Sequence, residues 1–215
     1  MTKIKKHNIS THPDPEKQKI LDYAGEKFLR EGFYKISMDS LANEIRISKK
    51  TIYKHFSSKD ELVEKIAEQI MQTISGRIET VIKSELNALG KALKLFEIMG
   101  DVTLKLTDKW VQDVKLHHPD LWKKIDGFRT KRAYTALSDI IKQGQEEGCI
   151  IKKPAELMIT LFVSAIRSIV NPDFLYYHKF NYKEAFVHSF EILFNGILTA
   201  KGKKEFNKIF AKVIK

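Results

Sequence analysis

The chain has 215 residues, of which 43% are hydrophobic and 30% are charged. This balance excludes an intrinsically disordered chain, which has few hydrophobic residues, and the length allows two folded domains. The 38 lysines and arginines outnumber the 27 acidic residues and give a formal net charge of +11. A positive charge of this size favours polyanionic partners, so nucleic acid and an anionic membrane surface are the two to distinguish.

The cysteine content and the apolar stretches bear on the compartment. A single cysteine, Cys149, excludes an intramolecular disulfide and a multi-cysteine metal site, and it fits a reducing compartment. The N-terminus carries Lys3, Lys5 and Lys6 without an apolar run behind them, so it does not read as a secretory signal. Polar residues interrupt the longest apolar stretch, residues 157–170, which predicts a buried helix. We expect a cytoplasmic protein without a membrane partner.

Apolar residues recur at spacings of three and four along the chain, which predicts an all-α fold. The first helix has clear ends, because Asp14 suits a capping position, Pro15 suits the first helical position and Gly32 suits a left-handed residue after the end. A short second helix is expected from a Ser37 cap to Ile45.

A third short helix is expected directly after the second, over residues 49–55 with Ser48 as its cap. About three residues separate the two, which is the spacing of a helix-turn-helix. A fourth helix opens with Ser58 and Glu61 in capping-box register. Softer breaks beyond residue 82 predict roughly five or six longer helices.

Residues 46–59 have the composition of a DNA-reading element, because cations alternate with hydrogen-bonding side chains and no acid occurs before Asp60. The second helix of a helix-turn-helix must enter the major groove, which requires such donors on a short helix. The donors are Arg46, Ser48, Lys49, Lys50, Thr51, Tyr53, Lys54, His55, Ser57, Ser58 and Lys59. The alternative is a solvated helix face. Ile52 and Phe56 favour the first interpretation, because they provide an apolar side that holds the helix in place.

A series of short motifs runs almost continuously over residues 17–62. It consists of Ile20-Leu21 through Phe28, Glu31-Gly32-Phe33, Ser37-Met38-Asp39-Ser40-Leu41-Ala42, Ile47-Ser48-Lys49, Thr51-Ile52-Tyr53-Lys54-His55-Phe56 and Ser58-Lys59-Asp60-Glu61-Leu62. The series resembles the N-terminal domain of TetR/AcrR-type regulators. The resemblance implies an N-terminal three-helix helix-turn-helix domain joined by a continuous helix to a larger helical domain that binds ligand and dimerises. We place these domains at residues 1–60 and 61–215.

The resemblance also implies a role for each matching residue. It places Ser37 and Tyr53 on DNA phosphates, and His55 and Lys59 at positions that contact the DNA backbone. It places Lys49, Lys50, Thr51 and Lys54 on the recognition helix, facing the groove. Tyr53 has an alternative as a packed aromatic residue with its hydroxyl in water. The arm with Lys3, Lys5 and Lys6 has two interpretations, a minor-groove contact or a solubilising tail.

Arg46 departs from the family pattern, which commonly has glycine in this turn. Glycine relieves a positive φ, so a side chain there costs about 1 kcal/mol unless the turn adopts a different backbone. A contact between Arg46 and a phosphate would offset that cost.

A dimer surface is expected in the C-terminal half, because palindromic recognition requires two recognition helices about 34 to 36 Å apart. Two segments, residues 157–170 and 186–198, are apolar on more than one face and must be covered on more than one side. Their candidate interface residues are Leu161, Ala165, Ile169, Phe186, Phe190, Leu193, Phe194 and Ile197. Packing of both segments against a second copy gives a four-helix interface, and the alternative is that both belong to the monomer core.

A ligand pocket in the C-terminal domain follows from the resemblance alone. The candidate lining residues are Phe96, Met99, Trp110, Trp122, Phe128, Tyr134 and Phe162, each with core packing as its alternative. An aromatic-rich, apolar lining suits a hydrophobic or aromatic effector.

Other chemistries have weaker support. No phosphate loop, nucleophile elbow or carboxylate cluster predicts an enzyme or a cofactor. Asp113 and His117 are one helical turn apart, but two ligands do not make a metal site, so we expect none. Cys149 has two interpretations, an oxidant sensor or a small buried hydrophobe.

The functional prediction is a DNA-binding transcriptional regulator, a dimeric repressor that a small apolar or aromatic effector releases from a palindromic operator. The alternative is a basic module that binds a membrane surface or a partner. Residues 203–215 motivate it, because Phe206, Ile209, Phe210 and Val213 line one face of a lysine-rich helix.

Overall fold

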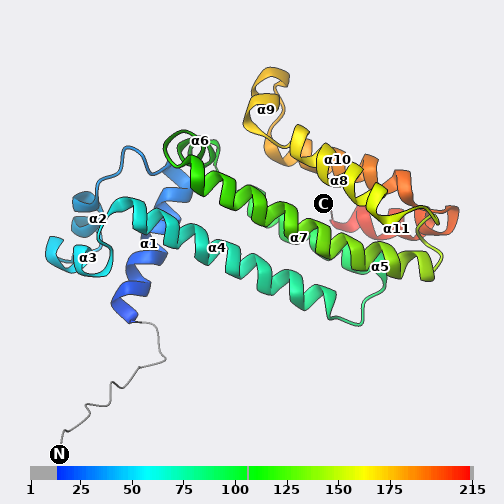
Figure 1. Cartoon of the computed structure of the whole chain (residues 1–215), viewed down its shortest axis with the longest axis horizontal. Helices are drawn as coiled ribbons and strands as arrows, with labels where there is room; N and C mark the ends of the chain where they lie inside the picture. The colour runs from blue at the N-terminus through cyan, green and yellow to red at the C-terminus, as the bar shows by residue number, and fades with distance from the viewer. Residues whose placement is uncertain (1–13, 106, 214–215) are drawn as a thin grey trace, which may run out of the picture.

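The computed structural model describes residues 14–105 and 107–213, and their secondary structure is helical apart from one isolated bridge between Ile150 and Leu198. The helices at the N-terminal end are α1 (Pro15–Glu31), α2 (Met38–Glu44), α3 (Lys49–His55) and the start of α4 (Lys59–Ile82), as Figure 1 shows. The others are α5 (Ala88–Lys105), α6 (Asp108–His117), α7 (Pro119–Glu146), α8 (Ala155–Ile169), α9 (Pro172–His178), α10 (Tyr182–Ile197) and α11 (Ala200–Val213). The all-α prediction is confirmed.

The number of C-terminal helices differs from the prediction. Within the described residues seven helices follow residue 82, where five or six were expected, because the short α6 and α9 are separate elements. The basic arm with Lys3, Lys5 and Lys6 lies outside the described residues.

Side-chain caps fix the starts of the N-terminal helices, as the sequence predicts. The hydroxyls of Ser37, Ser48 and Ser58 each accept a hydrogen bond from the backbone amide three residues later, at 3.0, 3.0 and 3.1 Å. The capping box at α4 is modified, because the Glu61 carboxylate accepts from the amide of Ser57, at 2.7 Å. These caps satisfy donors that a helix start leaves unpaired.

The N-terminal core does not end at residue 60, where the sequence analysis placed the domain boundary. Phe28, Phe33 and Ile52 are buried in a cluster that continues along α4 to Ala67 and includes Trp110 of α6. The expected continuity of α4 is confirmed. Helices from both halves of the chain therefore share one apolar cluster.

A separate aromatic core fills the C-terminal half. Phe190 of α10 lies 4.7 Å from Phe96 of α5 and 5.1 Å from Phe194, measured between ring centroids. Phe206 and Phe210 of α11 complete this cluster and are 0% and 4% exposed. Two residues of the apolar face of the lysine-rich C-terminal helix are therefore buried in the protein, whereas Ile209 is 38% exposed. The burial of Phe206 and Phe210 weakens the case for a membrane-surface module.

Three residues predicted for the dimer surface belong to this core instead. Phe186, Phe190 and Phe194 are 6%, 4% and 1% exposed in a single chain. The prediction was wrong for them because α10 is apolar on two faces, and its aromatic face packs on α5 and α11. No described helix is long and apolar enough to cross a membrane.

We predict that Gly202→Ala destabilises the protein, because α11 approaches the chain at Cys149 more closely than a side chain allows. A Cβ at residue 202 would lie 2.1 Å from the Cys149 carbonyl oxygen. Relief of such an overlap typically costs about 1–3 kcal/mol of unfolding free energy, which urea denaturation measures. Gly127→Ala in α7 is the control, since its Cβ meets nothing within 4 Å. Equal stability of Gly202→Ala and the wild type would show that α11 does not dock this closely.

Candidate nucleic-acid interface and internal cavity

A tight turn joins α2 and α3 into a helix-turn-helix. The amide of Ile47 donates to the Ala42 carbonyl at 2.9 Å, and Arg46 between them has a φ of 60°. Ile52 and Phe56 are both 0% exposed and anchor α3 on α1 and α4. The turn thus keeps the positive φ that glycine commonly provides, with an arginine in its place.

The five cations expected to contact DNA fall into two groups. Lys49 forms an ion pair with Asp39 of α2. The Lys59 ammonium donates to the carbonyl oxygens of Phe33, Tyr34 and Ile36, at 3.1, 2.8 and 3.1 Å. Lys59 therefore holds the loop between α1 and α2, a role that the sequence analysis did not predict.

The other three cations are available to a ligand. Arg46, Lys50 and Lys54 are exposed and form no ion pair with any described residue. Tyr53, on the same helix, is 47% exposed. The outer surface of the helix-turn-helix therefore presents three uncompensated positive charges and a phenol hydroxyl.

The hydroxyls and the imidazole of this region have partners within the chain. Ser37 and Ser48 are caps, and the Thr51 hydroxyl lies 2.9 Å from that of Ser48. The His55 side chain is 6% exposed, and its Nε2 lies 3.1 Å from a Glu16 carboxylate oxygen of α1. The ring is thus turned toward the acidic start of α1, which departs from the DNA-backbone contact expected for it.

We predict that Arg46→Gly stabilises the protein. The arginine has a left-handed backbone, which costs an L-residue about 1–2 kcal/mol, and the greater entropy of glycine in the unfolded chain returns part of the gain. We therefore expect roughly 0.5–1 kcal/mol of added stability in urea denaturation. Arg46→Ala is the control, because it removes the same charge but keeps the strain. A gain in stability for both variants would assign the effect to charge and contradict the prediction.

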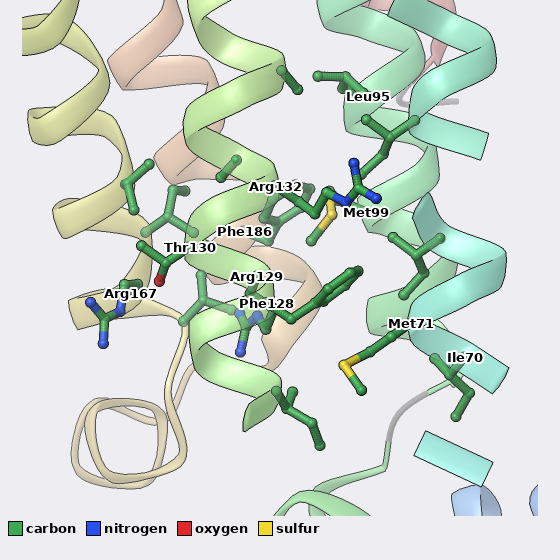
Figure 2. A pocket seen from close by; sticks show the side chains of 18 of the residues that line it. Ile70, Met71, Leu95, Met99, Phe128, Arg129, Thr130, Arg132, Arg167 and Phe186 are labelled. Atoms are coloured by element: carbon green, nitrogen blue, oxygen red, sulfur yellow. The ribbon is translucent and has the colours of Figure 1, made fainter. Parts of the chain in front are cut away.

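A cavity of about 220 Å³ lies among α4, α5, α6, α7, α8 and α10, with the arrangement that Figure 2 shows. Six of the seven predicted lining residues do line it: Phe96, Met99, Trp110, Trp122, Phe128 and Phe162. Tyr134 does not, because its hydroxyl lies 3.0 Å from that of Thr160 and its side chain faces outward.

The sequence analysis missed the polar part of the lining, which includes Arg129, Thr130, Arg132 and Arg167. The search for a pocket followed aromatic residues, and arginines on long helices are normally solvated. One signal was present, because Arg167 interrupts the apolar stretch at residues 157–170. In the structure it forms an ion pair with Asp126 of α7 at 2.5 Å.

α6 lies between the cavity and the DNA-reading end. Trp110, Val111 and Val114 line the cavity. From the same helix, the Asp113 carboxylate accepts hydrogen bonds from the amides of Phe33 and Tyr34, at 2.7 and 2.9 Å.

His117 also contacts the loop after α1, because its ring stacks on the Tyr34 ring at a centroid distance of 3.9 Å. Asp113 and His117 thus bind the loop after α1, which explains why they are a helical turn apart. Among the described residues no group of three or more histidine, cysteine or acidic side chains is placed to hold a metal.

Cys149 is buried, at 2% exposed, between α7 and α11. Burial, with the nearby Glu147 carboxylate, raises the pKa of its thiol to about 11. The thiolate is the reactive form, so the structure favours the buried hydrophobe over the oxidant sensor.

Comparison with known proteins agrees with this geometry. Residues 20–66 match the family described as bacterial regulatory proteins, tetR family. An uncharacterized HTH-type transcriptional regulator of Bacillus subtilis strain 168, YvaF, is 24% identical over 172 residues, which cover 80% of this chain and 90% of YvaF. The HTH-type transcriptional regulator UidR of Escherichia coli K12 is 28% identical over 108 residues, covering 44% of this chain and 55% of UidR. These relatives are regulators rather than enzymes.

Solved structures share the fold. A TetR-family transcriptional regulator from Marinobacter aquaeolei VT8 aligns with a TM-score of 0.72 and 18% identity, covering 92% of this chain and 98% of that one. SmeT, the repressor of the Stenotrophomonas maltophilia multidrug efflux pump SmeDEF, aligns with a TM-score of 0.62 and 11% identity, covering 86% and 91%.

The helix-turn-helix, its matched motifs and the helical body behind it define a DNA-binding transcriptional regulator. Its N-terminal region, residues 20–66, matches the tetR family of bacterial regulatory proteins, and the chain shares the fold of a solved TetR-family regulator.

Proposed function

We propose that the protein is a repressor that binds a palindromic operator as a homodimer in the cytoplasm, and that a small apolar or aromatic molecule in the cavity releases it. The observation that carries this proposal is the outer surface of the helix-turn-helix, where Arg46, Lys50 and Lys54 are exposed without ion pairs. Uncompensated cations next to a short, apolar-anchored helix fit the phosphates and base edges of a major groove.

The side chains divide into two classes of contact. Lys50, Tyr53 and Lys54 extend from the exposed face of α3, where they would reach the groove and its flanking phosphates. The remaining proposed contacts involve side chains that already have a hydrogen-bond or ion-pair partner within the chain: Ser37, Ser48, Lys49, Thr51, His55 and Lys59. Lys49 would exchange the Asp39 carboxylate for a phosphate. Lys59 and His55 would act mainly by positioning the helix.

We predict that the purified protein enriches a palindrome from random duplex DNA at fixed, near-physiological salt. Lys50→Ala should relax the preference at one position of each half-site and cost about 1–3 kcal/mol on the best site. Lys142→Ala is the control, because it removes an exposed lysine of α7 that forms no ion pair with a described residue. Salt-sensitive binding without an enriched sequence would contradict specific recognition.

A dimer surface is supported by apolar side chains that remain exposed on two adjacent helices. Leu157 and Leu161 of α8 are 56% and 59% exposed, and Ile192 of α10 is 72% exposed. Ala165, Ile169, Leu193 and Ile197 are partly buried. A contiguous exposed apolar patch of this kind commonly marks an interface. We propose that α8 and α10 pair with the same helices of a second copy, without the phenylalanines of the core.

Leu161→Asp should convert the dimer to a monomer, because a symmetric interface places the charge in both subunits and buries it without a partner. Sedimentation velocity measures the change. Leu116→Asp is the matched control, since Leu116 is 72% exposed on α6, away from this surface. A Leu161→Asp variant that stays dimeric would move the interface elsewhere.

Release of DNA is proposed to act through α6. A molecule in the cavity would press on Trp110, Val111 and Val114, which share α6 with Asp113. Since Asp113 holds the backbone after α1, a shift of α6 would move that loop and the helix-turn-helix with it. A ligand changes DNA affinity only as far as it binds one arrangement better than the other.

A further inference from the structure

The cavity contains a positive charge that the protein does not neutralise. Arg129 of α7 lines the cavity and forms no hydrogen bond or ion pair with any other described residue. Removal from water lowers the pKa of its guanidinium, and Asp126 opposes that effect only in part. Its side chain is partly exposed and lines the cavity.

The nearest carboxylate is already engaged. Asp126 forms its ion pair with Arg167 of α8, at 2.5 Å. Arg167 lies close enough to disfavour the charge of Arg129. Two guanidiniums therefore share one carboxylate, and one positive charge is left over on this side of the cavity.

A second polar group on the same side lacks a partner. The Thr130 hydroxyl is buried and has no hydrogen-bond partner among the residues that the structure describes. Figure 2 shows Thr130 and Arg167 on one side of α7, whereas Met71, Met99 and Leu95 lie on the other. The lining thus has a polar end with Thr130 and Arg167 and a mainly apolar end, which also holds the Arg132 side chain beside Met99.

A guanidinium withdrawn from water without a counter-ion is unfavourable, and so is a buried hydroxyl without a partner. A carboxylate matches both, because it accepts two parallel N–H bonds from arginine and a further bond from a hydroxyl. The cavity volume of about 220 Å³ is below the roughly 300–1,000 Å³ typical of pockets for drug-sized ligands. A small molecule is therefore the better fit.

We propose that the effector is a small anionic amphiphile whose carboxylate pairs with Arg129 and whose apolar or aromatic body fills the end lined by Met71, Met99 and Leu95. This inference rests on the proposed function and narrows its ligand from an apolar molecule to an organic acid. Arg132, which also lines the cavity, lies over the Phe128 ring at 6.0 Å and extends toward Met99 rather than toward Arg167.

The test compares acids with neutral molecules of the same shape. Isothermal titration calorimetry would measure phenylbutanoate against phenylbutanamide, and decanoate against decanamide, on the full-length wild type. We expect each acid to bind at least about tenfold more tightly than its amide. Arg129→Met should abolish this preference and leave amide binding unchanged. Arg132→Met, a matched loss of a cavity arginine, should keep it.

A second measurement needs no ligand. Because Arg129→Met removes an unpaired charge from the interior, its melting temperature should equal or exceed that of the wild type. A clear loss of stability would show that Arg129 has a structural partner and would overturn the proposal.

The other outcomes are also decisive. Equal binding of acid and amide, a preference that survives in Arg129→Met, or no binding by any of the acids would each overturn the inference. Gel-shift assays with the selected DNA separate this from the proposed function. If an amide releases DNA and the acids do not, the regulator stands and the anionic effector fails. If the protein selects no DNA sequence while Arg129 still discriminates acids, the proposed function fails and the ligand site stands.

Discussion

Residues 33–36, which follow Gly32 at the end of α1, are held from two sides, and the arrangement of the molecule depends on this contact. The Asp113 carboxylate of α6 accepts hydrogen bonds from the amides of Phe33 and Tyr34. The Lys59 ammonium at the start of α4 donates hydrogen bonds to the carbonyls of Phe33, Tyr34 and Ile36. Backbone groups of a loop must find partners, and here each partner comes from a different helix. α6 and α4 are therefore linked through one short stretch of backbone.

Gly32 makes this contact possible. It has a φ of 79°, and a Cβ in its place would lie 2.5 Å from an Asp113 carboxylate oxygen. A side chain would thus strain the backbone and displace the carboxylate at once. Gly32 ends α1 and also leaves room for the Asp113 carboxylate of α6. A local helix-stop signal therefore affects the packing of a helix that is distant in the sequence.

Two of the five expected DNA-binding cations have partners within the chain. Lys59 holds the loop, and Lys49 ties α3 to α2 through Asp39. Each sets the position of the recognition helix, whereas Arg46, Lys50 and Lys54 remain for DNA. Net charge alone does not separate these groups, because a lysine that is free for DNA and a lysine that holds a loop add the same charge to the chain.

The sequence predicted the features that depend on neighbouring residues. The serine caps and the stop at Gly32 each follow from interactions within a few residues, so local chemistry was sufficient. The sequence analysis left the backbone at Arg46 open, and the structure gives it a positive φ. Six of the seven residues predicted to line a cavity do line one, since large aromatic side chains on buried helices have few other places to go.

The errors have a different origin. Phe186, Phe190 and Phe194 give an apolar stripe whether they face a core or a second subunit, and only the position of α11 decides between these. Likewise, the partnerless state of Arg129 depends on Asp126 being taken by Arg167, which comes from another helix. Patterns along one helix cannot report such competition between helices.

The polar end of the cavity and α6 lie on different elements, and this separation bears on how a ligand could act. Arg129, Thr130 and Arg167 belong to α7 and α8, whereas Trp110, Val111 and Val114 belong to α6. When the carboxylate of a ligand is held at Arg129 on α7, the length of the ligand decides whether its apolar body reaches α6. Two acids of equal charge would then bind alike at Arg129 and differ in their effect on DNA, because only differential contact with α6 shifts the equilibrium. Affinity and release are thus separable properties of this cavity.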